Sequence, residues 1–235
     1  MKTSKIKIEI QRIKKYDNEL ERIWFIGEAI FHTTGRVECH NLIYYQETGS
    51  DFIETINPES PGQCITVWAA INAKGIIGPY IAAGNADSET YRIFLKKFTY
   101  ELRQFQRLRA EIYDPFFIHN NSPIHEGTDK MLDQEFSKGW VGPGSKYANW
   151  PKLSPDLNPI NFFLWGFIKN KVYTEPLEED NVTELALRIY HAFTDVTPGM
   201  LMEAINASKT KIDVQLTIQK HDIVPLSKIG GLVNS

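Results

Sequence analysis

The sequence predicts an α/β fold in α+β order, with a mixed central sheet that opens with an antiparallel meander and is flanked by helices. Two observations predict it: runs of β-branched and aromatic residues occupy the first third of the chain, and apolar residues recur at helical spacing from Ser88 onward. The chain has 235 residues, 42% of them hydrophobic, so it can bury a sizeable core in one large domain. This composition excludes a disordered, collagen-like or coiled-coil chain.

The strand candidates follow an amphipathic helical segment at residues 8–22 that has a local basic bias. They lie at residues 23–32, 37–45, 64–71 and 76–81. The first is a strand-like run, broken at Gly27, that we expect at the centre of the sheet. A Lys74-Gly75 turn joins the last two, so we expect consecutive antiparallel strands.

Helical patterns dominate the rest of the chain. Ser88 can cap a long helix, and a short strand at residues 116–119 leads through a polar turn into a second helix near residues 127–136. Residues 139–158 are rich in Pro and Gly and lack periodicity, which predicts an ordered loop held by Trp140 and Trp150.

The clearest helix signal begins at Asn158, an N-cap residue followed by Pro159 at the first helical position. Apolar residues then recur at positions 160, 163, 164, 167 and 168. Asn161 therefore falls in the first helical turn. Two more helices are predicted at residues 181–193 and 198–214.

Charge, cysteine content and hydropathy limit the classes of function. The chain has 26 Lys and Arg against 29 Asp and Glu, a net charge of -3, so any basic surface must be local. Cys39 and Cys64 cannot form a disulfide framework, and no apolar stretch has the length of a signal peptide or membrane span. We expect an unsecreted nuclear or cytoplasmic protein without a membrane partner.

Three segments resemble motifs of the mariner-like transposases, members of the DDE/D superfamily whose catalytic core has a ribonuclease H-like fold. Residues 150–166, WPKLSPDLNPINFFLWG, resemble the family's hallmark motif. Residues 24–32, WFIGEAIFH, resemble its first-strand motif, and residues 117–125, FIHNNSPIH, its central strand and turn. The residues carried over with these motifs, besides the catalytic positions, are Glu28, His125, Ser154, Pro155, Asp156, Asn158 and Trp165.

The resemblance also covers residues 67–71 and 76–79, and extends over roughly residues 10–222. It implies a ribonuclease H-like domain at residues 23–222, between an N-terminal amphipathic helical segment at 1–22 and a C-terminal tail at 223–235.

The resemblance implies a specific chemistry, in which three acidic residues hold two Mg²⁺ or Mn²⁺ ions that activate a water or a DNA 3′ hydroxyl. The three family acids fall at Gly27, Asn120 and Asn161, none of which is acidic. Glycine offers no side-chain ligand and asparagine only a neutral one, whereas hard cations need carboxylates. We therefore expect no bound metal, no cofactor and no phosphoryl transfer.

Other residues could in principle replace the missing acids. Glu28 follows Gly27, but adjacent side chains of a strand point to opposite faces, so it should point away. Asp156 fits a turn residue better than a ligand. His32, His119 and His125 have no ligand spacing and are expected to be structural.

Nucleic-acid contacts have few candidates in the sequence. Lys14, Lys15 and Lys152 could contact the phosphate backbone of a nucleic acid. The alternative for each is that it only lies on a solvated protein surface. Leu153 stands where the family commonly has an arginine, and the aromatic run at residues 162–167 fits a core better than a base-stacking platform.

The sequence leaves three functions open. The first is a catalytically inactive, transposase-derived domain that binds nucleic acid weakly and non-specifically, or a protein partner or a second copy of itself. The second is a purely structural protein-interaction module, and the third is a residual metal-dependent endonuclease. In the family, helix-turn-helix modules that bind DNA precede the catalytic core, and the resemblance here begins almost at the core. We therefore expect no sequence-specific recognition of DNA ends. Deliberate Asp-to-Asn replacement would account for positions 120 and 161 but fits Gly27 less well, and decay without selection or adoption by a host would also give this pattern.

Overall fold

The structure, a computed structural model, describes residues 22–35, 62–110, 113–120, 122–136, 139–147, 150, 154–177 and 181–220, and their side chains up to residue 212. The helix predicted at residues 8–22 lies outside this part of the chain except for Arg22. The strand predicted at residues 37–45 and the tail at 223–235 lie wholly outside it.

One mixed sheet organises the described residues, in the order β3-β2-β1-β4-β5. Its strands are β1 (Ile23–His32), β2 (Cys64–Asn72), β3 (Gly75–Ala83), β4 (Phe116–Ile118) and β5 (Trp140–Val141). Strands β1, β2 and β3 pair antiparallel, which confirms the predicted meander, whereas β4 runs parallel to β1 and to β5.

The central strand β1 is continuous, so the break predicted at Gly27 is wrong. Gly27 pairs with Ala69 of β2 in an unbroken register that runs from Phe25 to His32. Glycine weakens a strand because its backbone is freer, but the continuous pairing with β2 on both sides of Gly27 along the chain holds the backbone of this residue in place.

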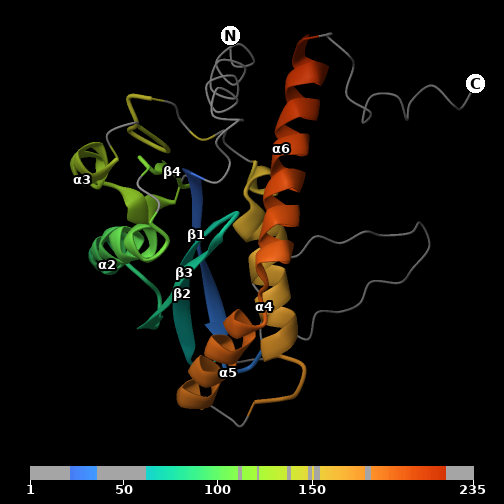
Figure 1. Ribbon diagram of the computed structural model, residues 1–235. Helices are drawn as coiled ribbons and strands as arrows, with labels where there is room; N and C mark the ends of the chain where they lie inside the picture. The colour runs from blue at the N-terminus through green and yellow to red at the C-terminus, as the bar shows by residue number, and fades with distance from the viewer. Residues whose placement is uncertain are drawn as a thin grey trace, which may run out of the picture.

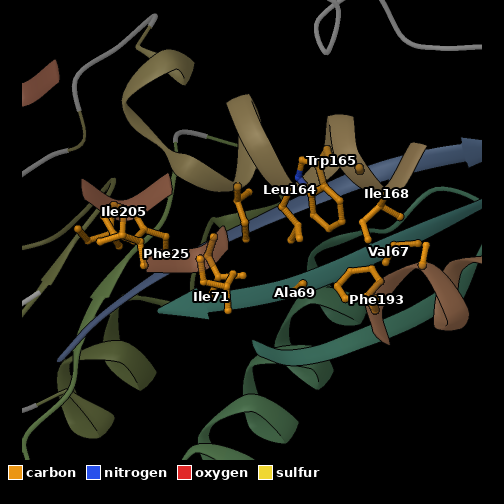
Figure 2. Close-up of a cluster of buried hydrophobic side chains, with 14 of the residues drawn as sticks. Phe25, Val67, Ala69, Ile71, Leu164, Trp165, Ile168, Phe193 and Ile205 are labelled. Atoms are coloured by element: carbon orange, nitrogen blue, oxygen red, sulfur yellow. The ribbon is translucent and has the colours of Figure 1, made fainter. Parts of the chain in front are cut away.

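Helices cover both faces of the sheet (Figure 1). One face carries α2 (Ser88–Leu108) and α3 (Asp129–Glu135), and the other carries α4 (Trp165–Val172), α5 (Val182–Thr194) and α6 (Pro198–Lys220). Side chains alternate along β1, so Trp24 and Ile26 join the core under α2 while Phe25 joins the core under α4 to α6. Figure 2 shows the core under α4 to α6.

Three predicted boundaries are corrected by the structure. Asp87 caps α2 in place of Ser88, because the Asp87 carboxylate accepts the Thr90 amide at 2.8 Å. The loop predicted at residues 139–158 contains β5, a strand of two residues that is too short to show periodicity. Helix α6 continues past residue 214 to Lys220, since no Gly or Pro interrupts it after Gly199.

Other expectations are confirmed. The helix predicted at residues 181–193 is present as α5, with Asn181 as its cap accepting the Glu184 amide at 2.9 Å, and β4 leads through the short 3-10 helix Pro123–His125 into α3. Among the described residues, no helix is both long and apolar enough to cross a membrane.

Candidate functional site

Two of the three positions singled out by the resemblance, Gly27 and Asn161, lie side by side on the face covered by α4 to α6, and the third, Asn120, follows β4. Gly27 lies in the middle of β1, and a Cβ placed on it would be 3.7 Å from Asn161 Oδ1. Asn120 lies two residues past Ile118, and Ile118 pairs with Phe25, which itself precedes Gly27 by two residues. Extending the parallel register by two residues past the end of β4 relates Asn120 to Gly27.

Asn158 fixes the turn that carries Asn161. Its fully buried side chain accepts the Ile160 amide at 3.0 Å and donates to the Ile26 carbonyl at 3.2 Å. The predicted cap therefore also ties the beginning of the helix to β1. The first turn, Ile160–Leu164, is π-helical where an α-helix was expected. The wider turn changes the apolar spacing too little to be read from the sequence.

Helix α6 supports the same turn from outside. Ser208 Oγ donates to the Leu157 carbonyl at 2.5 Å, and Lys211 Nζ donates to the Asp156 carbonyl at 3.1 Å. Lys211 Nζ also lies 3.6 Å from the centroid of the Phe162 ring. Sequence reasoning missed Ser208 and Lys211, because they lie about fifty residues from their partners and no local pattern marks them.

The short 3-10 helix Pro155–Leu157, preceded by Ser154, forms the other part of this turn. Asp156 lies in it with an exposed side chain, as expected of a turn residue. Trp165 is fully buried, and its ring packs edge-on against Phe31 with centroids 6.4 Å apart, which agrees with a core position. Lys14, Lys15 and Lys152 lie outside the described residues.

The space beside Gly27 is partly filled and partly polar. A Cβ at this position would overlap Ile160 Cγ2 and would lie 3.5 Å from Trp165 Nε1. The Trp165 indole N–H has no hydrogen-bond acceptor among the described residues, and Asn120 Oδ1 has no donor there. Position 27 thus adjoins an indole N–H that could donate to an acidic side chain placed there. The Cβ of such a side chain would, however, overlap the Ile160 Cγ2 methyl.

Glu28 lies on the opposite face of the sheet, as strand alternation predicts. Its Oε2 is 3.5 Å from His125 Nε2, and His125 Nδ1 lies 3.0 Å from the Asn120 carbonyl. Tyr91 OH lies 3.2 Å from His119 Nδ1, and the two histidine rings stack with centroids 4.5 Å apart. These contacts place Glu28, His119 and His125 in one buried cluster behind the site, away from Gly27.

Burial and charge set the protonation of this cluster. Burial raises the pKa of the Glu28 carboxyl, but His125 and a hydrogen bond with Ser122 outweigh it, and the pKa lies below its usual value. Burial holds the pKa of His119 well below its usual value, and burial with the Glu28 charge raises that of Tyr91. Glu28 is therefore a carboxylate whose Oε2 already neighbours the His125 imidazole.

His32 has a different environment from the other two predicted structural histidines. It is buried at the end of β1, and its carbonyl accepts the Tyr173 hydroxyl at 2.9 Å. Among the described residues, no three His, Cys, Asp or Glu side chains form a group that could hold a metal ion.

The strand order, with an antiparallel meander beside two parallel strands and helices on both faces, defines a ribonuclease H-like domain. No family model matches the chain. In sequence it is 22% identical over 209 residues to the transposable element Tc3 transposase of Caenorhabditis elegans, covering 87% of this chain and 59% of that protein.

Solved structures of Mos1 transposase share the fold. The catalytic domain of Mos1 mariner transposase aligns with a TM-score of 0.59 at 13% identity, covering 93% of this chain and 91% of that one. The Mos1 mariner paired-end complex with Mn aligns at 0.64 and 18%, covering 93% and 62%. The chain is thus homologous to Tc3 transposase, has the fold of the Mos1 catalytic domain, and spans about three fifths of the length of the longer relatives.

Proposed function

We propose that this chain is a transposase-derived ribonuclease H-like domain without phosphoryl-transfer activity, a pseudoenzyme that acts by binding nucleic acid. One observation carries the proposal: Gly27 and Asn161 adjoin one another, Asn120 follows the end of the neighbouring strand β4, and none of the three is acidic. The neighbouring carboxylate, Glu28, belongs to the cluster on the other face.

The residues present do not fit a pair of divalent cations. Mg²⁺ and Mn²⁺ bind through anionic oxygens, and these three positions supply two neutral amides and a hydrogen atom. The Ile160 methyl also takes space beside Gly27. Loss of a single positioned electrostatic group commonly lowers a rate by about a hundred- to a thousand-fold, so the loss of three supports an inactive domain.

Nucleic-acid binding is supported by the retained fold and by the nature of its relatives. One Mos1 structure with this fold is a paired-end complex with the left transposon end, and it aligns over 93% of this chain with a TM-score of 0.62. Binding through a protein partner or a second copy is the alternative mode of action, and the net charge of -3 favours it.

Metal binding and cleavage test the proposal directly. The chain is titrated with Mn²⁺ and Mg²⁺ by calorimetry, and a labelled duplex is incubated with each metal. We expect no binding at low-millimolar metal and no cleavage. The matched variant Glu28→Gln should behave identically, since Glu28 faces away. Cleavage by the unsubstituted chain, or metal binding that Glu28→Gln abolishes, would overturn the proposal.

Nucleic-acid association is tested separately by the anisotropy of a labelled duplex at increasing salt. A positive result is binding that weakens steeply as ionic strength rises. If no duplex or single strand binds even at low salt, the alternative of a protein-interaction module replaces the proposed function.

A further inference from the structure

Helix α2 presents a regular row of basic side chains to solvent. Its buried side, including Phe94, Phe98 and Leu102, packs on the sheet. Lys96, Tyr100, Arg103 and Arg107 follow one another at intervals of four, three and four residues, which places them on one exposed side of the helix. Tyr100 is 63% exposed.

The charge of this stretch departs from that of the chain. Residues 92–109 contain six basic side chains and one acidic side chain, Glu101, although acids outnumber bases in the whole sequence. The basic residues are Arg92, Lys96, Lys97, Arg103, Arg107 and Arg109. The overall charge allows only a local basic surface, and α2 with the Arg109 that follows it carries one.

Part of this charge is available to a partner, whereas Arg109, just past the end of α2, donates to the Lys74 carbonyl at 2.9 Å. Arg92 pairs with Glu89 at 3.2 Å and Arg103 with Glu135 at 2.5 Å, but both arginines are substantially exposed. Exposed pairs of this kind contribute little stability, so phosphates can replace these carboxylates at low cost. Lys96 and Arg107 make no side-chain hydrogen bond or ion pair with any described residue.

We propose that the outer face of α2 binds the sugar-phosphate backbone of duplex nucleic acid without sequence preference. The proposal deepens the nucleic-acid binding proposed above and rests on it. Lys96 and Arg107 are separated by about 16 Å along the helix, nearly half of the roughly 34 Å repeat of a duplex. The duplex presents about one negative charge per 1.7 Å of its axis, a density that suits a row of cations.

The composition of the row favours nucleic acid over an acidic protein. From Lys96 to Arg107 the exposed residues of α2 are polar or charged except for Tyr100, and the exposed aliphatic residues of the helix, Ile93 and Leu108, lie beyond the two ends of the row. Protein interfaces generally have an apolar centre, which this row lacks. The Tyr100 hydroxyl can donate to a phosphate oxygen, as tyrosines do in many nucleic-acid complexes.

The position of α2 separates this basic surface from the non-acidic residues at positions 27 and 161. It lies across the sheet from Gly27 and Asn161, on the side away from α4 to α6 (Figure 1). A chain without catalytic acids would therefore keep this surface unchanged.

The test measures the anisotropy of a labelled random-sequence duplex of about 20 base pairs with the full chain, from about 50 to 200 mM KCl. For Lys96→Gln/Arg107→Gln we expect the negative slope of log K against log salt to become shallower by about two. We also expect the affinity at the lowest salt to fall about tenfold or more. The control Lys171→Gln/Lys209→Gln removes the same charge from α4 and α6 and should bind like the unsubstituted chain. Thermal unfolding of each variant checks that the fold is kept.

The outcomes separate the two proposals. Equal binding and equal salt slopes for the α2 variant and the unsubstituted chain would overturn the α2 surface and leave nucleic-acid binding standing. No binding of any nucleic acid would overturn both. Tighter binding to a single strand, or to polyglutamate, than to the duplex would overturn the assignment of a duplex backbone.

Discussion

Gly27 lies where a side chain would overlap its neighbour. We expect Gly27→Ala to lower the free energy of unfolding by about 1–3 kcal/mol, because its Cβ would overlap the buried Ile160 Cγ2 methyl. Urea denaturation followed by tryptophan fluorescence measures the change. Gly166→Ala is the control: an added Cβ meets nothing within 4 Å in α4, so it should stabilise by about 0.5–1 kcal/mol.

A second substitution tests the cause. Ile160→Leu removes the branched Cγ2 methyl and keeps the volume of the side chain. The double variant Gly27→Ala/Ile160→Leu should therefore cost less than the sum of the two single changes. Strict additivity would contradict the overlap as the source of the destabilisation.

Glu28 should make the stability depend on pH. Its pKa is lowered in the folded protein, so its contribution is present above the unfolded pKa of about 4.3 and is lost as the pH falls through the folded value. Glu28→Gln cannot titrate. The difference in free energy of unfolding between the unsubstituted chain and Glu28→Gln should therefore shrink from about pH 5 to about pH 3, in urea titrations at each pH. A difference that stays constant over this range would contradict the pairing with His125.

At the scale of elements, the start of α2 depends on one side chain. Asp87 accepts from both the amide and the hydroxyl of Thr90, at 2.8 and 2.7 Å. Asp87→Ala should lower the melting temperature by roughly 2–4 °C, because a helical amide loses its acceptor and the helix dipole loses a favourable charge. Ser88→Ala should have little effect in the same calorimetric scan. A larger fall in melting temperature for Ser88→Ala than for Asp87→Ala would contradict Asp87 as the cap and favour Ser88.

At the scale of the whole molecule, one sheet separates two cores. Phe98 belongs to the core under α2, and Ile205 to the core under α4 to α6, so the two side chains share no contact across the sheet. Phe98→Leu and Ile205→Val should each cost about 0.5–1.5 kcal/mol, and the double variant should be additive within about 0.5 kcal/mol. Denaturation monitored by fluorescence and by circular dichroism should give one shared midpoint. Two separate midpoints would mean that the faces unfold independently.

Much of the fold and part of the site follow from short-range pattern. The strands at 64–71 and 76–81 and the helices from Ser88 and Asn181 were predictable, because apolar spacing and capping depend on neighbouring residues. Strand β5 was not, since two residues carry no period. The π-helical turn at Ile160–Leu164 was not, since the wider turn changes the apolar spacing too little to be read from the sequence.

The absence of acids at 27, 120 and 161 and the direction of Glu28 toward the opposite face of the sheet were accessible from residue identity and strand alternation alone. The neighbourhood of those residues depended on the tertiary structure. Ile160 beside Gly27, His125 beside Glu28, and Ser208 beside Leu157 join segments between about 50 and 130 residues apart. A sequence pattern reports local periodicity, whereas these contacts arise only when helices pack on a sheet and bring distant segments into the same layer.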